Sequence, residues 1–348
     1  MKKILAMILA AMMLLALAAC GTTADETSAP PSDDAAVSDA PAEESEAPSE
    51  PAEAQYLVGI CQQMTHDALD SATQGFKDAL ADILGEGAVE YSEGNAGGEQ
   101  PNCVTIIDGL VSENVDLILA NATWPLQAAY SATSEIPVLG TSVTDYATAL
   151  NIDDWTGTVG GNISGTSDLA PLDQQAAMIQ ELFPETEYPN VGLLYCSAEP
   201  NSIFQVETIQ GYLEDMGYTC STYAFTDVND LSSVTQAACD ASDVIYIPTD
   251  NTAAGNTETI ANVVLAAGVP VVAGESGICS GCGVATLSID YYELGYTTGE
   301  MAAKILTGEA DISTMPIEYA PNVTKMYNAA NCKALGITIP EGYTAIEG

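Results

Sequence analysis

Polar residues that could hold a small ligand follow a short apolar strand in the second half of the sequence. Residues 244–247 are β-branched and aromatic, which predicts a buried strand. Pro248 ends this strand, and residues 249–252 are helix-capping types that precede an expected helix over residues 257–267. Because ligands of open α/β sheets bind where strands end at helix N-termini, this turn is a candidate binding element.

The same arrangement occurs earlier in the chain. Residues 116–123 read Asp-Leu-Ile-Leu-Ala-Asn-Ala-Thr, an apolar strand and a polar turn, before an expected helix over residues 125–133. Upstream of the two copies, expected strands at residues 58–61 and 191–196 each precede a helix that carries Gln-Gly-aromatic. Two halves that repeat one β-α-β-α order predict an α/β fold of two Rossmann-like lobes with a ligand cleft between them. Chance likeness between βα units is the alternative.

The turns at these strand ends supply the candidate ligand-binding residues. The first half contributes Gln62, Gln63, His66, Thr123, Trp124, Ser142, Thr144 and Asp145. The second half contributes Ser197, Glu199, Asn201, Ser202, Asp250, Asn251, Thr252 and Glu275, and Asp290 lies at an expected crossing between the lobes. Any one of these residues could instead cap a helix or a turn without touching a ligand.

The residues that catalysis or metal binding would need are scarce. His66 is the single histidine, so nucleophilic chemistry and a zinc site would each lack partners. No glycine-rich phosphate loop or nucleophile elbow is present. For Cys279-Ser-Gly-Cys282 we expect a local disulfide or two free thiols rather than a metal site or a redox enzyme. We predict no enzyme, no cofactor and no metal.

The charge of the chain limits its partners. The 348 residues include 49 acidic residues against six Lys and no Arg, a formal net charge of −43. Such a surface repels phosphate backbones, which excludes nucleic acid as a partner. Without a guanidinium group, a ligand carboxylate would have to meet hydroxyls, backbone N–H groups and helix N-termini.

The N-terminal segment reads as a leader and a tether. Residues 1–19 carry Lys2, Lys3 and an uncharged apolar run too short for a comfortable membrane span, which indicates a signal peptide. The Leu17-Ala-Ala-Cys20 pattern resembles a bacterial lipobox, which implies cleavage before Cys20 and a lipid on its sulfur; an ordinary secretory signal is the alternative. Residues 21–54 hold ten acidic residues and no basic one, so we expect a disordered tether.

The expected lobes are discontinuous in sequence. We assign residues 55–165 and 290–314 to lobe 1 and residues 166–289 and 315–348 to lobe 2. Residues 142–165 are expected to form a long polar loop near the first crossing. A long helix from Asp290 to Leu306 returns to lobe 1, and the tail from Met315 completes lobe 2.

Five stretches carry a family likeness over residues 55–340: His66-Asp-Ala-Leu-Asp70, Asp116-Leu-Ile-Leu-Ala120, Ser197-Ala-Glu-Pro-Asn-Ser202, Pro248-Thr-Asp-Asn-Thr252 and Ile289-Asp-Tyr-Tyr-Glu-Leu-Gly-Tyr296. The chain resembles the type I periplasmic-binding-protein-like substrate-binding lipoproteins of ABC importers, most closely the tryptophan or aromatic amino-acid type. It departs from them at Trp124 and at Cys279-Ser-Gly-Cys282.

This resemblance implies a monomeric protein whose lobes close on a small ligand, an aromatic amino acid. It further implies a lipid anchor on the extracytoplasmic face of the cell membrane, and delivery to an ABC permease and its ATPase. We expect Asp250, Asp290 or Glu199 to pair with the ligand ammonium, and Trp124 either to line the cleft or to pack locally. A sensory module that feeds a receptor, or a protein that binds a sugar or another solute, is the alternative.

Overall fold

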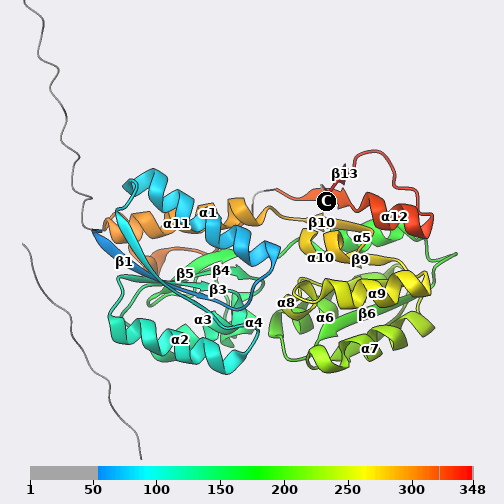
Figure 1. Cartoon of the computed structure of the whole chain (residues 1–348), viewed down its shortest axis with the longest axis horizontal. Coiled ribbons are helices and arrows are strands. Elements are labelled where there is room, and N and C mark those ends of the chain that lie inside the picture. The colour runs from blue at the N-terminus through cyan, green and yellow to red at the C-terminus, as the bar shows by residue number, and fades with distance from the viewer. Residues whose placement is uncertain (1–53, 321, 347–348) are drawn as a thin grey trace, which may run out of the picture. The chain divides into compact units, whose positions relative to one another are not determined.

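The computed structural model describes residues 54–320 and 322–346. Two sheets, each covered by helices on both faces, form the two lobes (Figure 1). The first sheet has six strands in the order β11-β5-β4-β3-β1-β2, and all their pairings are parallel. The second has seven strands in the order β13-β12-β10-β9-β8-β6-β7, with β10 and β12 antiparallel. The predicted α/β fold of two Rossmann-like lobes is confirmed.

The first sheet is a parallel sheet buried on both faces. Its strands are β1 (Tyr56–Gln62), β2 (Val89–Asn95), β3 (Leu117–Asn121), β4 (Val138–Val143), β5 (Ile163–Ser167) and β11 (Glu318–Tyr319). The helices α1 (Asp67–Leu84) and α11 (Tyr291–Leu306) pack on one face, and α2 (Gln100–Glu113), α3 (Thr123–Ala132) and α4 (Tyr146–Leu150) pack on the other. Every residue of β3 and β4 is buried, as helices on both faces require.

The second sheet has the same three layers. Its strands are β6 (Asn190–Cys196), β7 (Thr219–Phe225), β8 (Val244–Ile247), β9 (Val271–Ala273), β10 (Ala285–Ser288), β12 (Thr324–Tyr327) and β13 (Thr344–Ala345). One face is covered by α5 (Leu172–Leu182), α6 (Pro200–Asp215) and α12 (Ala329–Leu335). The other is covered by α7 (Val228–Ala241), α8 (Asn251–Ala254), α9 (Thr257–Ala267) and α10 (Ser276–Gly281). A short 3-10 helix (Ile312–Thr314) precedes β11.

The helices α1 and α11 lie side by side along the first sheet (Figure 1). Their backbones approach so closely that a methyl group at Gly295 would overlap the carbonyl oxygen of Ala72. A methyl group at Gly75 would overlap the carbonyl of Tyr292 in the same way. These two glycines therefore set the distance at which α11, which begins at a crossing between the sheets, joins the first lobe.

The structure corrects two predicted lobe limits. Thr166, assigned to lobe 2, lies in β5, and residues 318–319, also assigned to lobe 2, pair with β5 in the first sheet. The expected long loop over residues 142–165 contains α4 and the start of β5. The β5 sequence Ile-Ser-Gly-Thr-Ser has one apolar side chain, so no strand pattern marks it. Its hydroxyls instead bond within the fold, and Thr166 Oγ1 lies 2.8 Å from Thr298 Oγ1. The other limits stay predictions.

Helix α3 starts earlier than predicted. It begins at Thr123 rather than near Pro125. Thr123 and Trp124 are therefore helical residues, so Trp124 does not lie in a free turn.

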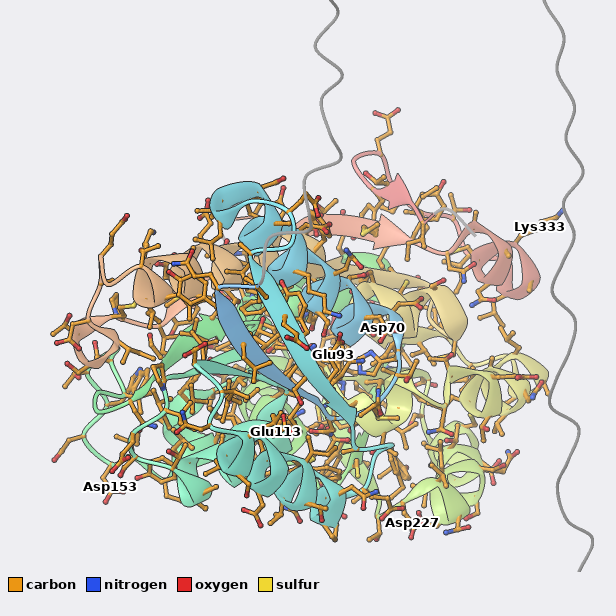
Figure 2. All side chains as sticks on the ribbon, turned by 60° about the vertical axis from the view of Figure 1, so that its left-hand side comes forward. Asp70, Glu93, Glu113, Asp153, Asp227 and Lys333 are labelled. Carbon is orange, nitrogen blue, oxygen red and sulfur yellow. The ribbon has the colours of Figure 1, made fainter. Side chains whose placement is uncertain are left out.

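The surface of the described part is strongly acidic. Figure 2 shows the labelled acids Glu93, Glu113, Asp153 and Asp227 spread over several elements. Across residues 54–320 and 322–346, two ion pairs form, Lys77 with Glu93 at 2.6 Å and Lys325 with Glu181 at 2.5 Å. Within the same ranges, no helix combines the length and apolar character that crossing a membrane would require. The predicted signal peptide, Cys20 and residues 21–53 of the predicted tether lie outside the described residues.

Candidate functional site

The carboxyl ends of four neighbouring strands in the first sheet carry buried polar side chains. The sheet order β5-β4-β3-β1 places Asp168, Ser142, Thr123 and Gln63 in sequence along one edge. Parallel strands end at the same edge, which is why residues so far apart in the chain meet there. Each of the four is at most 5% exposed.

Two of these strand ends have an unusual backbone. Ala122, just before α3, has φ 95°, and Ser142 has φ 55°. Residues other than glycine rarely adopt this left-handed region, and such strained positions cluster at binding sites. At Ala122 this backbone leads directly into the first turn of α3, whose N-terminal N–H groups begin at the same edge.

The same edge gathers polar atoms that have no partner. Gln63 Nε2, Thr123 Oγ1, Ser142 Oγ and Asp168 Oδ1 are buried and make no hydrogen bond. With Asn121 Oδ1, from the last residue of β3, they make five of the eight such side-chain atoms among the described residues. Buried polar groups are normally satisfied, and leaving one unpaired costs about 1–3 kcal/mol. A ligand with complementary groups would satisfy them.

Asp168 Oδ1 makes no hydrogen bond of good geometry, although the Thr144 hydroxyl is close enough to lower the pKa of this carboxyl. Its Oδ2 accepts a 2.9 Å hydrogen bond from the hydroxyl of Tyr291, the first residue of α11. Burial raises the pKa of the Asp168 carboxyl above its usual range. An ammonium group placed against the free Oδ1 would favour the charged form.

The carboxylates of the second lobe already have protein donors. Glu199 accepts from the backbone N–H of Asn251 at 3.1 Å and from both the N–H and the hydroxyl of Thr252, at 2.8 and 2.7 Å. Asp250 caps α8 and accepts from the N–H groups of Ala253 and Cys196 at 2.8 and 2.6 Å. These contacts are those of buried helix caps.

Glu275 is likewise a cap, because it accepts from the N–H of Gly277 at 2.6 Å. Burial raises the pKa values of Asp250 and Glu275 to about 7. Glu199 adds to the shift at Asp250, since its charge lies nearby. Both carboxyls would therefore bind or release a proton close to neutral pH.

A small cavity of about 10 Å³, room for about one water molecule, lies where the two lobes meet. Its lining is drawn from both, with His66, Ala68 and Leu69 from the start of α1, Thr249, Asp250, Asn251, Ala254 and Glu275 from the second lobe, and Asp168 and Tyr291 from the crossings. His66 Nε2 lies 3.2 Å from Asn251 Oδ1 and links the lobes directly. Burial lowers the pKa of His66.

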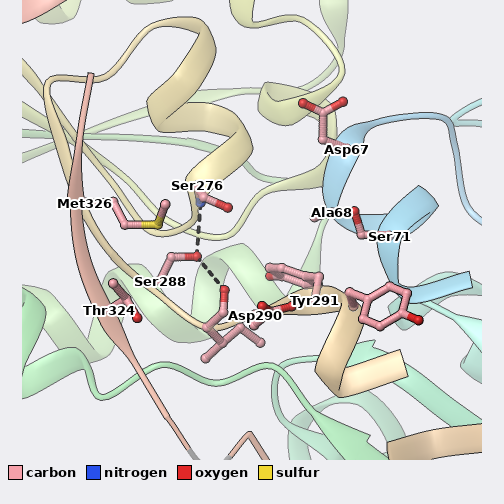
Figure 3. Close-up of a pocket in the computed structure, with 11 residues that line it drawn as sticks. Asp67, Ala68, Ser71, Ser276, Ser288, Asp290, Tyr291, Thr324 and Met326 are labelled. Atoms are coloured by element: carbon pink, nitrogen blue, oxygen red, sulfur yellow. Dashed lines mark hydrogen bonds between the residues drawn. The ribbon is translucent and has the colours of Figure 1, made fainter. Parts of the chain in front are cut away.

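A second pocket of about 280 Å³ lies beside the crossings (Figure 3). It is lined by Asp67, Ser71, Asp290 and Thr324 among others, and Ser288 Oγ joins the N–H of Ser276 to the carbonyl of Ile289 (Figure 3). Asp290 is exposed, lines this pocket rather than the small cavity, and caps α11.

The structure brings most, but not all, of the predicted site residues together. Gln63, His66, Thr123, Ser142, Thr144, Glu199, Asp250, Asn251, Thr252 and Glu275 lie at the facing strand ends or line the cavity. Gln62, also at the end of β1, donates to Asp70. Asn201 and Ser202 are buried at the start of α6.

Besides Asp290, three predicted residues lie apart from both the facing strand ends and the cavity lining. Ser197 is exposed and donates to the carbonyl of Phe225, and Asp145 caps α4 by accepting from Thr148. Trp124 is 7% exposed, packs in the first core cluster and lines a groove between α2 and α3. Its role as a cleft wall stays a prediction.

The prediction missed Asp168 and Tyr291. Asp168 follows β5, which was read as loop, so the rule that strand ends bind ligands was not applied there. Tyr291 was part of the quoted Ile-Asp-Tyr-Tyr stretch but was given no role.

No group of His, Cys, Asp and Glu in the described residues is arranged to hold a metal ion. Cys279 and Cys282 are buried free thiols, one of the two predicted states.

Comparison with known proteins identifies the family. Residues 57–346 match the ABC transporter substrate binding protein family. The chain belongs to this family. It is 31% identical over 283 residues, 81% of each chain, to a tyrosine-binding protein of Clostridioides difficile strain R20291.

Solved structures agree with this assignment. The chain matches an ABC domain in complex with L-Trp from Streptococcus pneumoniae with a TM-score of 0.79 and 31% identity, covering 85% of this chain and 100% of that one. It matches a ligand-free, open substrate-binding protein with adhesive properties from Clostridium difficile with a TM-score of 0.65, also at 31% identity, over 84% and 99% of the two chains. At equal identity, the structure is more similar to the tryptophan complex than to the open form.

Proposed function

We propose that this substrate-binding protein captures an aromatic amino acid as a zwitterion between its lobes and delivers it to an ABC permease. The observation that carries the proposal is the row of buried, unpartnered polar atoms at the edge of the first sheet. A zwitterionic amino acid has one acceptor group, the carboxylate, and one donor group, the ammonium, on the same carbon atom. The row offers matching partners for both.

The ligand carboxylate would lie between β3 and β4. Thr123 Oγ1 and Ser142 Oγ have no other partner and can each donate to it, as can Gln63 Nε2. The N-terminus of α3, a helix of ten residues, faces the same place and favours negative charge. This answers how a chain without Arg could bind a carboxylate.

The ligand ammonium would lie against Asp168. The predicted partners Glu199 and Asp250 are occupied by protein donors, and Asp290 is outside the cavity lining. Among the described residues, Asp168 Oδ1 is the one buried carboxylate oxygen without a hydrogen-bond partner. Neighbouring strands are about 4.8 Å apart, so an ammonium at β5 and a carboxylate at β4 suit one amino acid.

The cavity is smaller than an amino acid, so the lobes would have to separate to admit the ligand, whose side chain would then extend along the apolar part of the lining. Leu69, Ala254 and the ring of Tyr291 provide that surface, and a ring stacked on Tyr291 would gain about 0.5–1.5 kcal/mol beyond its buried area. The relatives that bind tyrosine and L-Trp support an aromatic side chain. Lipid anchoring at Cys20 on the extracytoplasmic face, delivery to a permease and the monomeric state belong to the same proposal.

Calorimetric titration tests the ligand class. The protein is unfolded, freed of bound small molecules, refolded and titrated with tyrosine, tryptophan, phenylalanine, leucine, glucose and inositol. We expect one equivalent of an aromatic amino acid to bind, more tightly than leucine, with no heat from the sugar or inositol. Binding of glucose or inositol with no amino acid bound would refute the proposal.

A further inference from the structure

A short segment of the first lobe contacts the second lobe at two places. This segment, residues 63–66 between β1 and α1, we call the clasp segment. His66 Nε2 lies 3.2 Å from Asn251 Oδ1, and the terminal methyl group of Met64 fills the place that a Cβ atom at Gly255 would take. Building on the proposed capture of a ligand between the lobes, we propose that Met64 and His66 are positioning residues. They hold the closed lobes together and so set the rate at which the ligand leaves.

The clasp segment is fixed to the first lobe. The carbonyl of Gln63 accepts from the N–H of Gly98 at 2.9 Å. The hydroxyl of Thr65 accepts from Asn95 Nδ2, at the end of β2, at 3.1 Å. Because both ends of the segment are bonded to this lobe, the segment moves with it. Its two contacts with the second lobe therefore break when the lobes open to admit a ligand and form again when they close on it.

The contact between His66 and Asn251 has a defined direction. Asn251 Nδ2 donates to Glu199 Oε2 at 2.7 Å, which leaves the oxygen of the same amide facing His66. His66 Nε2 must therefore carry the hydrogen and donate it to this oxygen. His66 directly precedes α1, but its side chain makes no cap hydrogen bond and is free for this contact. Asn251 is 7% exposed, so the bond is largely shielded from water.

The contact of Met64 explains a glycine that the backbone does not require. Gly255 follows α8 with φ −72° and ψ −7°, a right-handed conformation that any residue adopts. It is exposed, so the surface around it leaves room for a side chain. A Cβ atom there would nevertheless overlap Met64 of the other lobe. Gly255 is therefore a notch that receives Met64 when the lobes are closed.

The contact of Met64 with Gly255 acts without touching the ligand. Neither residue lines the small cavity, whereas His66 and Asn251 do. His66 and Ala254 line both this cavity and an outer pocket of about 340 Å³, so the clasp contacts lie between the two. A ligand that leaves on this side must wait until these contacts break. Their strength should therefore appear in the dissociation rate constant.

Stopped-flow mixing of a matched pair of variants tests the role of His66. The ligand is L-tyrosine or L-tryptophan, whichever binds the unmodified chain more tightly, and intrinsic fluorescence follows its release. His66→Ala should raise the dissociation rate constant by roughly two- to tenfold, as the loss of one hydrogen bond implies. His66→Gln should stay close to the unmodified chain, because its side-chain N–H can still donate to Asn251. Equal rates for His66→Ala and the unmodified chain, or for His66→Ala and His66→Gln, would overturn this role.

Filling the notch tests the role of Met64. Gly255→Leu should raise the dissociation rate constant by about fivefold or more, as overpacking does. The same substitution should have little effect in Met64→Ala, where the notch is vacant. Gly211→Leu is the matched control, because Gly211 is an exposed helical glycine of the same lobe with open space around it. An equal rise in both backgrounds, or no rise in either, would overturn the proposal.

Failure of the clasp and failure of the proposed function give different results. If neither L-tyrosine nor L-tryptophan binds the unmodified chain, the proposed function fails. Small-angle X-ray scattering of the ligand-free protein then decides on the clasp. Gly255→Leu should have a larger radius of gyration than the unmodified chain, because the closed arrangement is disfavoured, and equal radii would overturn the clasp.

Discussion

The buried carboxylates of this site differ in whether one of their oxygens is still free to accept a hydrogen bond. Glu199, Asp250 and Glu275 have the burial of ligand-binding groups, but their oxygens accept from helix N–H groups and side chains. Asp168 has the same burial and keeps one oxygen free. The first three therefore shape the second lobe, and Asp168 is the residue with binding capacity left.

Glu275 gives a pH dependence that can be measured. Its pKa rises from 4.5 to about 7 through burial, with Asp67 and Asp168 adding smaller contributions. Between these two pH values the folded protein keeps a proton that the unfolded chain has lost. The free energy of unfolding therefore falls as pH rises from about 4.5 to 7, by at most about 3 kcal/mol from this residue.

Urea denaturation of ligand-free Glu275→Gln at pH 5 and pH 8 should show a smaller pH effect than the unmodified chain. Glu258→Gln is the matched control, because Glu258 likewise lies at the start of a helix but is exposed, and it should keep the full pH effect. An unchanged pH effect in Glu275→Gln would show that the residue is ionised in the folded protein across this range.

Most of the polar residues at this edge of the first sheet could be predicted from the sequence. Thr123, Ser142 and Gln63 followed recognisable apolar strands, so their place at a sheet edge could be inferred from the sequence. Asp168 could not, since the strand before it is built of hydroxyls and glycine and is stabilised by contacts such as that of Thr166 with Thr298. Which carboxylate oxygens stay free depends on three-dimensional partners, and no spacing in the sequence reports them.

At the scale of elements, the close packing of α1 and α11 holds a crossing in place. Helix α11 begins at Tyr291, whose hydroxyl donates to Asp168, so the position of this helix bears on the site. The glycines at the contact allow the two backbones to touch, as shown by the overlap that a methyl group at Gly295 would cause. Backbone atoms cannot move aside as a flexible side chain can.

Gly295→Ala should therefore destabilise the protein by about 1–3 kcal/mol, as overpacking does. Gly211→Ala is the control, because Gly211 is an exposed residue of α6 with open space around it, and alanine is the better helix former there. Thermal unfolding of both variants gives the comparison. Equal melting temperatures for the two would contradict the close contact.

The order of most elements could also be predicted, since the spacing of apolar residues distinguishes the strands from the helices between them. Helix starts were less certain: the cap of α3 is Ala122, a residue type that gives no capping signal, so the helix was expected two residues late. The short β11 was missed because its place is set by pairing with β5.

At the scale of the whole molecule, two lobes meet around a cavity that draws residues from both. The contact of His66 with Asn251 joins them across it, and the bond of Tyr291 to Asp168 joins two crossings. Greater similarity to a tryptophan complex than to an open, ligand-free relative agrees with a closed arrangement. A ligand that contacts both lobes only in this arrangement shifts the protein toward it.

The most direct test removes each charged group from the ligand and its partner from the protein. Tyrosine, tyramine, which lacks the carboxylate, and 3-(4-hydroxyphenyl)propanoate, which lacks the ammonium, are titrated into the unmodified chain, Thr123→Val and Asp168→Asn. Circular dichroism confirms that each variant is folded. Hydrogen bonds to charged groups contribute about 1.5–3 kcal/mol, which is roughly a ten- to hundredfold change in affinity.

We predict that Asp168→Asn weakens tyrosine and tyramine by that factor but leaves the propanoate unchanged. Thr123→Val should weaken tyrosine and the propanoate but leave tyramine unchanged. Folded Asp168→Asn that binds tyrosine as tightly as the unmodified chain, or variants that weaken all three ligands equally, would contradict the proposed placement of a zwitterionic amino acid between Thr123 and Asp168.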